Sequence, residues 1–407
     1  MTSSSMYHEL TKAVNIPGFF VTKFESYPDR IRLYIQRRSH VARCSRCGRY
    51  SGEFYDSKQR VLRDFNWVDK PCFLALSRVR LFCRYCWRVR VEKLPFASKR
   101  GTFTTRFENS IVELARYMTR ADVALHFGVS EDTVGRLEWR ALQNFKPTRS
   151  TLKGLKQLRC DEIAKRKGHN YVTVITDALT GRVVWVADGR RQQDLDGFFK
   201  ALGPRGCLEI EAVCIDMSRS YIPAFEKGCP NAKIVFDRFH IVKHFHEAMN
   251  AIRKSDILKS PESEKTKWRY SRHALGKDRA DLTEKQSETL AWMLKEKPMI
   301  AMVYQLKSRL SKIWEVPTLR GAKISLTRWI QRANKIESPA MKAFCKMLER
   351  HRRGILNYHL YQLTNGPQEG FNNKLNVLRR RAYGFRNVDW YSLKIFQASM
   401  PKESIHT

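Results

Sequence analysis

Three aspartates in the middle of the chain could hold a metal ion. Asp161, Asp216 and Asp237 each follow a short run of apolar residues. Carboxylates at the ends of buried strands suit hard cations such as Mg²⁺, because the rigid backbone holds the ligands without reorganisation. Each acid alone also fits a plain turn residue, since Asp is a common turn former. Three of them in one α/β stretch favour a metal site.

Four cysteines form a second candidate metal site. They occur as two Cys-x-x-Cys pairs, Cys44 with Cys47 and Cys83 with Cys86. Two such pairs fit a tetrahedral zinc ion bound by four thiolates. The spacer contains two strand-like runs, 73–76 and 79–82, which predict a β-hairpin that returns the second pair to the first. The alternative is four unrelated free cysteines. The surrounding arginines indicate that zinc would support a phosphate-contacting surface.

A third group lies near the end of the chain, after a Gly-Pro step. Its pattern predicts a helix with an apolar stripe on one face, and Glu369 and Asn373 share a different face because they are four residues apart. A lone Glu on a helix is usually solvated. Here an arginine cluster follows it, which predicts phosphate binding by Arg379, Arg380, Arg381 and Arg386.

The elements that would position these acids span residues 158–246. Two β-branched runs, 171–175 and 183–186, flank a Thr-Gly turn and predict a hairpin. Helical patterns over 194–202 and 221–227 then alternate with two further strands. Three antiparallel strands followed by alternating helix and strand is the order of a ribonuclease H-like core.

Upstream of this stretch, the pattern from Asp122 to Arg140 predicts a helix-turn-helix. Gly128 suits the turn and Ser130 suits the cap of the second helix. That helix would offer Thr133, Arg136 and Arg140 to a DNA groove. The alternative is a helical pair without a role on DNA.

The remaining segments carry less chemistry. Residues 1–40 contain strand-like runs, and residues 141–154 read as a linker. The segment 246–361 is polar and rich in Lys and Arg, with apolar residues at helical spacing. It predicts a helical platform without chemistry of its own.

The amino-acid composition indicates which class of partner the protein binds. The chain has 407 residues, enough for two to four domains, and 76 Lys and Arg against 40 Asp and Glu give a net charge of +36. Such an excess indicates a polyanionic partner, with nucleic acid first. We expect no transmembrane helix and no signal peptide. Ten cysteines then indicate a reducing compartment and, where clustered, metal binding.

Together these motifs resemble one family. The chain is similar to bacterial insertion-sequence transposases with an Asp-Asp-Glu triad, of the ISL-three group. The resemblance rests on the paired cysteines, the helix-turn-helix, the two strand aspartates and the motif Asn365-Gly366-x-x-Glu369-Gly370-x-Asn372. The segment Asp237-Arg238-Phe239-His240 and the run from Arg381 to Arg386 strengthen it.

The resemblance implies an α+β multidomain protein. Its parts would be an N-terminal zinc-binding β module, a helix-turn-helix domain, and a ribonuclease H-like α/β catalytic core interrupted by an all-helical insertion. The expected boundaries are 1–100, 101–150, 151–246 for the first part of the core, 247–360 for the insertion and 361–407 for the helix with the catalytic Glu.

The resemblance also implies a site and a function. Asp161, Asp216 and Glu369 would bind two Mg²⁺ or Mn²⁺ ions, with Asp237, His240 and Asn373 around them, and one structural Zn²⁺ would lie at the cysteines. The enzyme would cut the terminal inverted repeats of its element and join them to target DNA, as a dimer or larger assembly in the bacterial cytoplasm, at the nucleoid. The alternatives are a related ribonuclease H-like endonuclease and a domesticated DNA-binding regulator with an inactive nuclease core.

Overall fold

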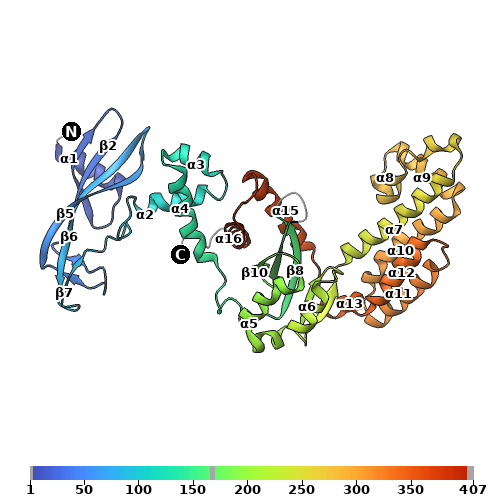
Figure 1. The fold of residues 1–407 in the computed structure, drawn as a ribbon. Helices are drawn as coiled ribbons and strands as arrows, with labels where there is room; N and C mark the ends of the chain where they lie inside the picture. The colour runs from blue at the N-terminus through green and yellow to red at the C-terminus, as the bar shows by residue number, and fades with distance from the viewer. Residues whose placement is uncertain (1–2, 166–169, 401–407) are drawn as a thin grey trace. The chain divides into compact units, whose positions relative to one another are not determined.

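We analyse a computed structural model of the chain, which describes residues 3–165 and 170–400 (Figure 1). The chain divides into two compact units, Met1–Asn144 and Phe145–Thr407.

The first unit begins with a β module. Its elements are α1 (Ser3–Val14), β1 (Phe19–Ser26), β2 (Ile31–Arg37), β3 (Ala42–Arg43), β4 (Tyr50–Ser51), β5 (Phe54–Trp67), β6 (Lys70–Cys83) and β7 (Arg88–Val91). The main sheet has the order β1-β2-β6-β5, with β7 paired to β6. Strands β5 and β6 form a long antiparallel ribbon that turns at Val68, whose φ is +59°.

The predicted hairpin between 73–76 and 79–82 is wrong, because both runs belong to the single strand β6. The residues between them, Ser77 and Arg78, pair with Gln59 and Lys58 of β5 instead of turning. No Gly, Pro, Asn or Asp separates the two runs, and Ser77 is the one turn-forming residue between them, so the local preference for a turn is weak. The β5–β6 ribbon therefore brings the second cysteine pair to the first.

Three helices complete the first unit: α2 (Thr105–Leu114), α3 (Arg120–Phe127) and α4 (Glu131–Leu142). Gly128 ends α3 with a φ of +63°, a left-handed conformation that glycine adopts without strain. Ser130 caps α4, since its side chain accepts a hydrogen bond from the Thr133 amide at 3.2 Å. Val134 packs with Val123 in the core of these helices. The predicted helix-turn-helix is confirmed.

The second unit is built on a five-stranded sheet. Its strands are β8 (Gln157–Ala164), β9 (Tyr171–Asp177), β10 (Val183–Asp188), β11 (Ala212–Ile215) and β12 (Lys233–Phe236). They lie in the order β10-β9-β8-β11-β12. The first three are antiparallel, and β8, β11 and β12 run parallel. The predicted sequence of strands and helices is confirmed, except that β8 continues three residues beyond Asp161.

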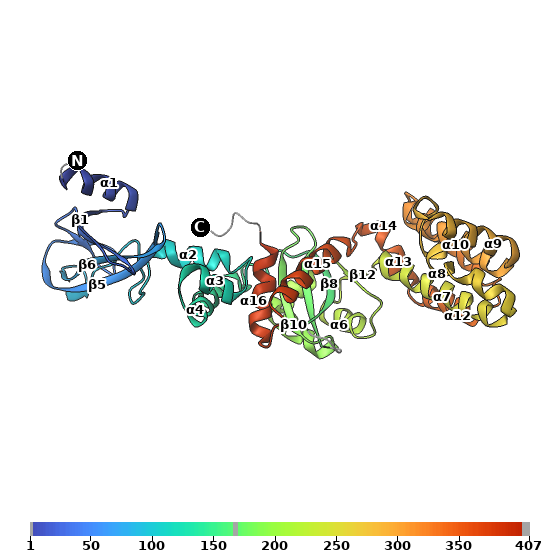
Figure 2. The same ribbon diagram turned by 90° about the horizontal axis from the view of Figure 1, so that it is seen from above.

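Helices cover both faces of this sheet (Figure 2). On one face lie α5 (Asp196–Glu209) and α6 (Tyr221–Gly228), and on the other lie α15 (Gly366–Arg381) and α16 (Val388–Ser399). The alternation of side chains along β9 explains both layers: Val172 and Val174 pack against α15 and α16, while Thr173 and Ile175 face α6 and α5. Strand β9 is buried on both faces, and its sequence accordingly carries apolar residues on both, interrupted by the buried Thr173 and Thr176.

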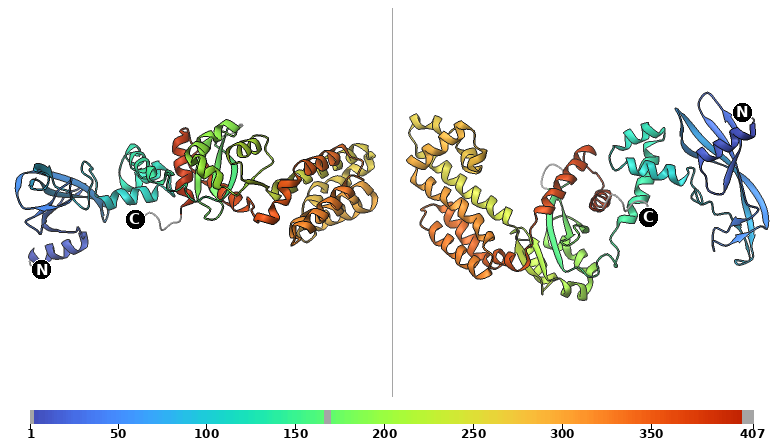
Figure 3. Two further views of the ribbon diagram at one scale, coloured as in Figure 1. Left: turned by 90° about the horizontal axis from the view of Figure 1, so that it is seen from below. Right: turned by 180° about the vertical axis from the view of Figure 1, so that it is seen from behind.

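Every regular element from Arg238 to Tyr361 is helical (Figure 3). The elements are α7 (Arg238–Lys259), η3 (Glu262–Trp268), α8 (Ser271–Gly276), η4 (Arg279–Asp281), α9 (Glu284–Glu296), α10 (Pro298–Glu315), α11 (Leu319–Ala333), α12 (Pro339–Arg350), α13 (Arg352–Leu356) and α14 (Tyr358–Tyr361). Helix α13 packs on the sheet, where Asn357 donates a hydrogen bond to the Ile234 carbonyl at 2.8 Å. None of the described helices is long and apolar enough to cross a membrane.

Candidate active site and zinc site

The register of the parallel strands in the second unit puts the three predicted aspartates at about the same height along neighbouring strands. Asp216 and Asp237 directly follow β11 and β12, whose last residues, Ile215 and Phe236, are register partners. Strand β11 also pairs with β8, Cys214 opposite Arg159. Continued by two residues, that register puts Asp216 beside Asp161. Neighbouring strands lie about 4.8 Å apart, so the first two acids meet on adjacent strands.

Asp161 lies on the face of β8 that α15 covers. Its two carboxylate oxygens accept hydrogen bonds from the Glu162 amide at 2.9 Å and from Nδ2 of Asn372 at 2.8 Å. Burial raises the pKa of Asp161 to about 6, and the nearby charge of Asp216 adds to the increase. The Glu162 amide, the charge of His240 and Asn372 act in the opposite direction. The charge of Asp216 therefore disfavours the charged form of Asp161, as a nearby like charge does.

Asp237 links the end of β12 to the start of α15. It is 4% exposed, and its Oδ1 accepts a hydrogen bond from the Asn365 amide at 3.3 Å. The side chain of Asn365 reaches the Cys160 carbonyl at 3.4 Å. Together these bonds fix the first turn of α15 beside β8 and β12. His240, in the first turn of α7, is half-buried and acts electrostatically on Asp161.

Glu369 lies in the first turn of α15, and its side chain is exposed. It forms no side-chain hydrogen bond or ion pair within the described part of the chain. Among residues 3–165 and 170–400, the four zinc-site cysteines are the one group of three or more His, Cys, Asp or Glu whose ligand atoms all lie within 4.8 Å of one another. The carboxylate oxygens of Asp161, Asp216 and Glu369 therefore do not all lie within 4.8 Å of one another in this structure.

A row of hydrogen-bonded polar side chains, one hydroxyl and two amides, connects α15 to the sheet. Thr176 donates to Oε1 of Gln368 at 3.0 Å, Gln368 donates to Oδ1 of Asn372 at 3.5 Å, and Asn372 donates to Asp161. We call Thr176, Gln368 and Asn372 the amide ladder. Sequence reasoning placed Asn373 near the site, but its side chain is exposed and α15 presents Asn372 to Asp161.

A signal for the ladder exists in the sequence. Gln368 and Asn372 are spaced by four residues, and Leu375 continues the same stripe one turn further along. Polar residues in phase with a buried leucine must find hydrogen-bond partners when they are buried. The predicted apolar stripe of this helix is confirmed, since Phe371, Leu375 and Leu378 belong to the core between α15 and the sheet, but the prediction missed these two amides.

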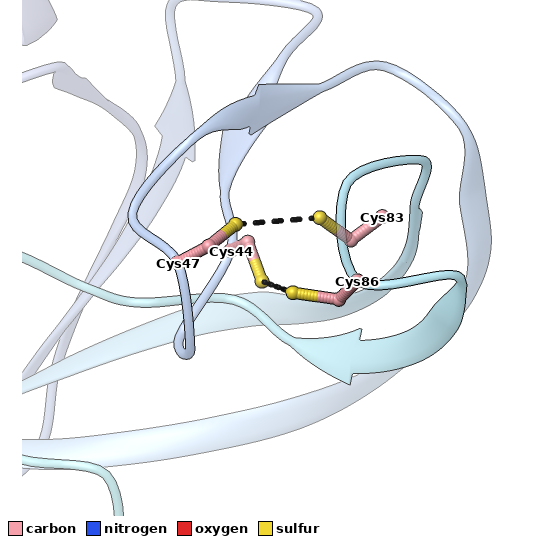
Figure 4. A group of neighbouring side chains, drawn as sticks. All are labelled: Cys44, Cys47, Cys83 and Cys86. Atoms are coloured by element: carbon pink, nitrogen blue, oxygen red, sulfur yellow. Dashed lines mark hydrogen bonds between the residues drawn. The ribbon is translucent and has the colours of Figure 1, made fainter.

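The four cysteines lie at the knuckle between β3 and β4 and at the turn between β6 and β7 (Figure 4). The sulfurs of Cys47 and Cys83 are 3.5 Å apart, and those of Cys44 and Cys86 are 4.0 Å apart. Four sulfurs bound to one zinc at about 2.3 Å lie about 3.8 Å from one another. The cluster therefore fits a tetrahedral zinc ion.

The environment of Cys44 also suits a thiolate ligand. Burial raises the pKa of Cys44, but the backbone N–H groups of Cys47 and Arg46 outweigh it and lower that pKa to about 7. Burial and hydrogen bonds with the other thiols raise the pKa of Cys86 to about 12. Four thiolates this close repel one another, and a divalent cation would relieve that repulsion.

Comparison with known families shows which kind of protein carries these residues. Residues 158–395, more than half of the chain, match the ISL3 family described as "Transposase". The chain belongs to the ISL3 transposase family. In this transposase, residues 92–137 match the "Helix-turn-helix domain of transposase family ISL3". Residues 40–86 match the "zinc-finger of transposase IS204/IS1001/IS1096/IS1165", and the four cysteines fall inside that match.

Two curated proteins resemble the transposase over most of its length. The transposase for insertion sequence element IS1001 of Bordetella parapertussis is 28% identical over 374 residues, which cover 91% of this chain and 92% of the relative. The transposase for insertion sequence element IS1557 of Mycobacterium tuberculosis is 29% identical over 385 residues, covering 88% of this chain and 86% of the relative.

The basic residues predicted to bind DNA differ in their surroundings. In the transposase's helix α4, Arg136 and Arg140 are exposed and Thr133 is half-buried at the first turn. Arg140 lies 3.8 Å from Glu108. In α15, Arg380 is exposed, whereas Arg379 donates to the Ala164 carbonyl at 2.5 Å and so helps to dock α15 on β8. Arg386 is exposed and Arg381 is half-buried.

Proposed function

We propose that this transposase binds the terminal inverted repeats of its insertion sequence, cleaves the ends by metal-dependent phosphodiester hydrolysis, and joins the 3′-hydroxyls to target DNA. The observation that carries the proposal is the register of the sheet. The pairing of β11 with β8, continued by two residues, supports a position of Asp216 beside Asp161, and Asn372 ties Asp161 to the helix that bears Glu369. Rigid strands are a suitable support for carboxylates that must hold cations.

The order β10-β9-β8-β11-β12 supports a ribonuclease H-like core. In this assignment the helices between β12 and α15 are an insertion that separates the third acid from the first two. The proposed domains are a zinc module over 1–100, a helix-turn-helix domain over 101–150, a core over 151–246 and 361–407, and an insertion over 247–360.

Asp161, Asp216 and Glu369 are the residues that would hold the cations. Their oxygens suit Mg²⁺ or Mn²⁺, which supply polarisation of the scissile phosphate and activation of the attacking hydroxyl. Asp161 uses one oxygen on Asn372, so its carboxylate plane is fixed before DNA arrives. Glu369 has no partner among the described residues, which leaves it free to turn toward the two aspartates when substrate is bound.

Other residues of the chain would bind and orient the DNA. Exposed Arg136 and Arg140 on α4 suit a groove, and Arg380 and Arg386 suit phosphates near the catalytic acids. The zinc ion would hold the knuckle loops and the arginines around them. Since an element has two ends, we propose that two or more copies assemble on DNA.

The test compares DNA cleavage with DNA binding. Asp216→Asn keeps the shape of the side chain and removes its charge, so it should abolish Mn²⁺-dependent nicking of a duplex that carries the element's end. Binding of the same duplex in EDTA should stay within a few-fold of the unaltered protein. Asp196→Asn, at an exposed acid of α5, is the matched control and should cleave normally. Unaltered protein that binds the end but never cuts it would instead be a DNA-binding regulator.

A further inference from the structure

A second concave surface lies beside the proposed active site. A cavity of about 830 Å³ opens between α6, β12 and the α12–α13 corner, a size within the range of ligand sites. Its lining begins at Met217 and Arg219, directly after Asp216. We call it the β12 groove.

The charge of the β12 groove is strongly positive. Four cations line it, namely Arg219, Lys233, Arg350 and Arg353, against one acid, Glu226. None of the four cations forms a side-chain hydrogen bond or ion pair with a described residue. Four unpaired cations around one concavity repel one another, and an anion bound between them would remove the repulsion.

The walls of the groove are fixed by packing. His351 meets the Phe236 ring edge-on with centroids 4.9 Å apart, and Asn357 is hydrogen-bonded to Ile234. Gly354 lies so close to Phe236 that a Cβ there would fall 2.4 Å from the ring. The α13 backbone therefore sits directly on the edge strand, which holds Arg350 and Arg353 at a set distance from β12. A preformed site loses less entropy when it binds.

We propose that the β12 groove binds the sugar–phosphate backbone of the DNA strand as it leaves the catalytic edge of the sheet. This inference rests on the proposed function. Arg219 connects the proposed active site to the groove. Asp216 accepts a hydrogen bond from the Ser218 amide at 2.9 Å, and Arg219 is the next residue in the chain. A strand held at Asp216 thus meets Arg219 first and then Arg350 and Arg353 across the groove.

The charge favours DNA over a protein partner. Phosphate binding by Lys and Arg gains free energy from the release of counterions. Three of the four cations are arginines, whose planar guanidinium groups can make bidentate contacts with phosphate oxygens. The lining also includes Met217, Ile222 and Met347, which are half-buried and offer apolar surface to the sugar rings. Evenly spaced phosphates are the only negatively charged groups that the groove requires of its ligand.

The test is the salt dependence of DNA binding by the full chain. Each phosphate contact contributes about −0.9 to the slope of log K against log salt for duplex DNA. Arg350→Ala with Arg353→Ala should therefore make the slope less steep by about 2 on a labelled 40-base-pair duplex that extends past the element's end. The variant is expected to fold, because both side chains are exposed.

The matched control removes two cations of α10 outside the groove. Arg309→Ala with Lys312→Ala deletes the same charge from exposed positions and should leave the slope unchanged. Equal changes in both variants would reduce the effect to net charge and overturn the inference. An unchanged slope in the groove variant would overturn it as well, and would leave a protein ligand as the occupant. If the unaltered protein cuts DNA in either case, the proposed function stands.

Discussion

The amide ladder gives the sharpest structural prediction, because α15 offers its own control. Asn372→Ala removes the hydrogen bond to Asp161, while Asn373→Ala removes an exposed amide from the next position of the same helix. Both changes replace Asn by Ala in a helix and gain about 0.5 kcal/mol of helix propensity, so that contribution cancels between them.

The magnitude follows from the charge of the acceptor. Hydrogen bonds to charged groups contribute about 1.5–3 kcal/mol to stability, and the half-buried position of Asn372 favours the lower end. We therefore expect Asn372→Ala to be less stable than Asn373→Ala by about 1.5 kcal/mol. For units of this size about 1 kcal/mol shifts Tm by about 2–4 °C, so the two variants should melt about 3–6 °C apart at pH 7.5.

The assay is thermal unfolding followed by Mn²⁺-dependent cleavage of element-end DNA. Asn372→Ala should also cleave more slowly at limiting Mn²⁺, with partial recovery at high Mn²⁺, because an Asp161 carboxylate held only by the Glu162 amide binds a cation less well. Asn373→Ala should match the unaltered protein in both measurements. Variants that melt within about 1 °C of each other and cleave alike would refute the role of the ladder.

Two further changes test the zinc site and the helical segment. Cys44→Ser should release zinc, measured by metal analysis of the purified protein, and should lower the affinity for element-end DNA; full zinc content would contradict the assignment. Gly354→Ala should destabilise the second unit by about 1–2 kcal/mol in urea unfolding. A Cβ only 2.4 Å from Phe236 puts the clash in the upper part of the overpacking range, about 2–3 kcal/mol, and the helix gains about 1 kcal/mol. Unchanged stability would show that α13 can move off β12.

Local chemistry is what the sequence predicted well. The helix-turn-helix depends on a glycine that must adopt positive φ and on a serine that caps the next helix, and both requirements are met within a few residues of the chain. The cysteine pairs are similar, since each knuckle is local and only their meeting depends on the sheet. The parallel strands were visible because buried strands read as apolar runs.

Features that depend on register were not predictable in this way. The ribbon of β5 and β6 replaced a local hairpin because pairing along the whole of β5 satisfies more backbone groups than a tight turn does. The rotation of α15 decides whether Asn372 or Asn373 meets Asp161, and one residue changes the direction by about 100°. The stripe of buried residues on that helix is set by the sheet beneath it, which the chain reaches only after the helices from Arg238 to Tyr361.

The central claim is that Glu369 completes a catalytic triad with Asp161 and Asp216. The most direct test is Glu369→Gln, assayed for Mn²⁺-dependent cleavage, DNA affinity and Tm. Because the side chain is exposed and unpaired in the described structure, Tm and affinity should not change. Cleavage by Glu369→Gln should nevertheless be lost, because the third metal-binding carboxylate is missing. Cleavage retained within a few-fold would show that Glu369 is an ordinary solvated acid and would contradict the account.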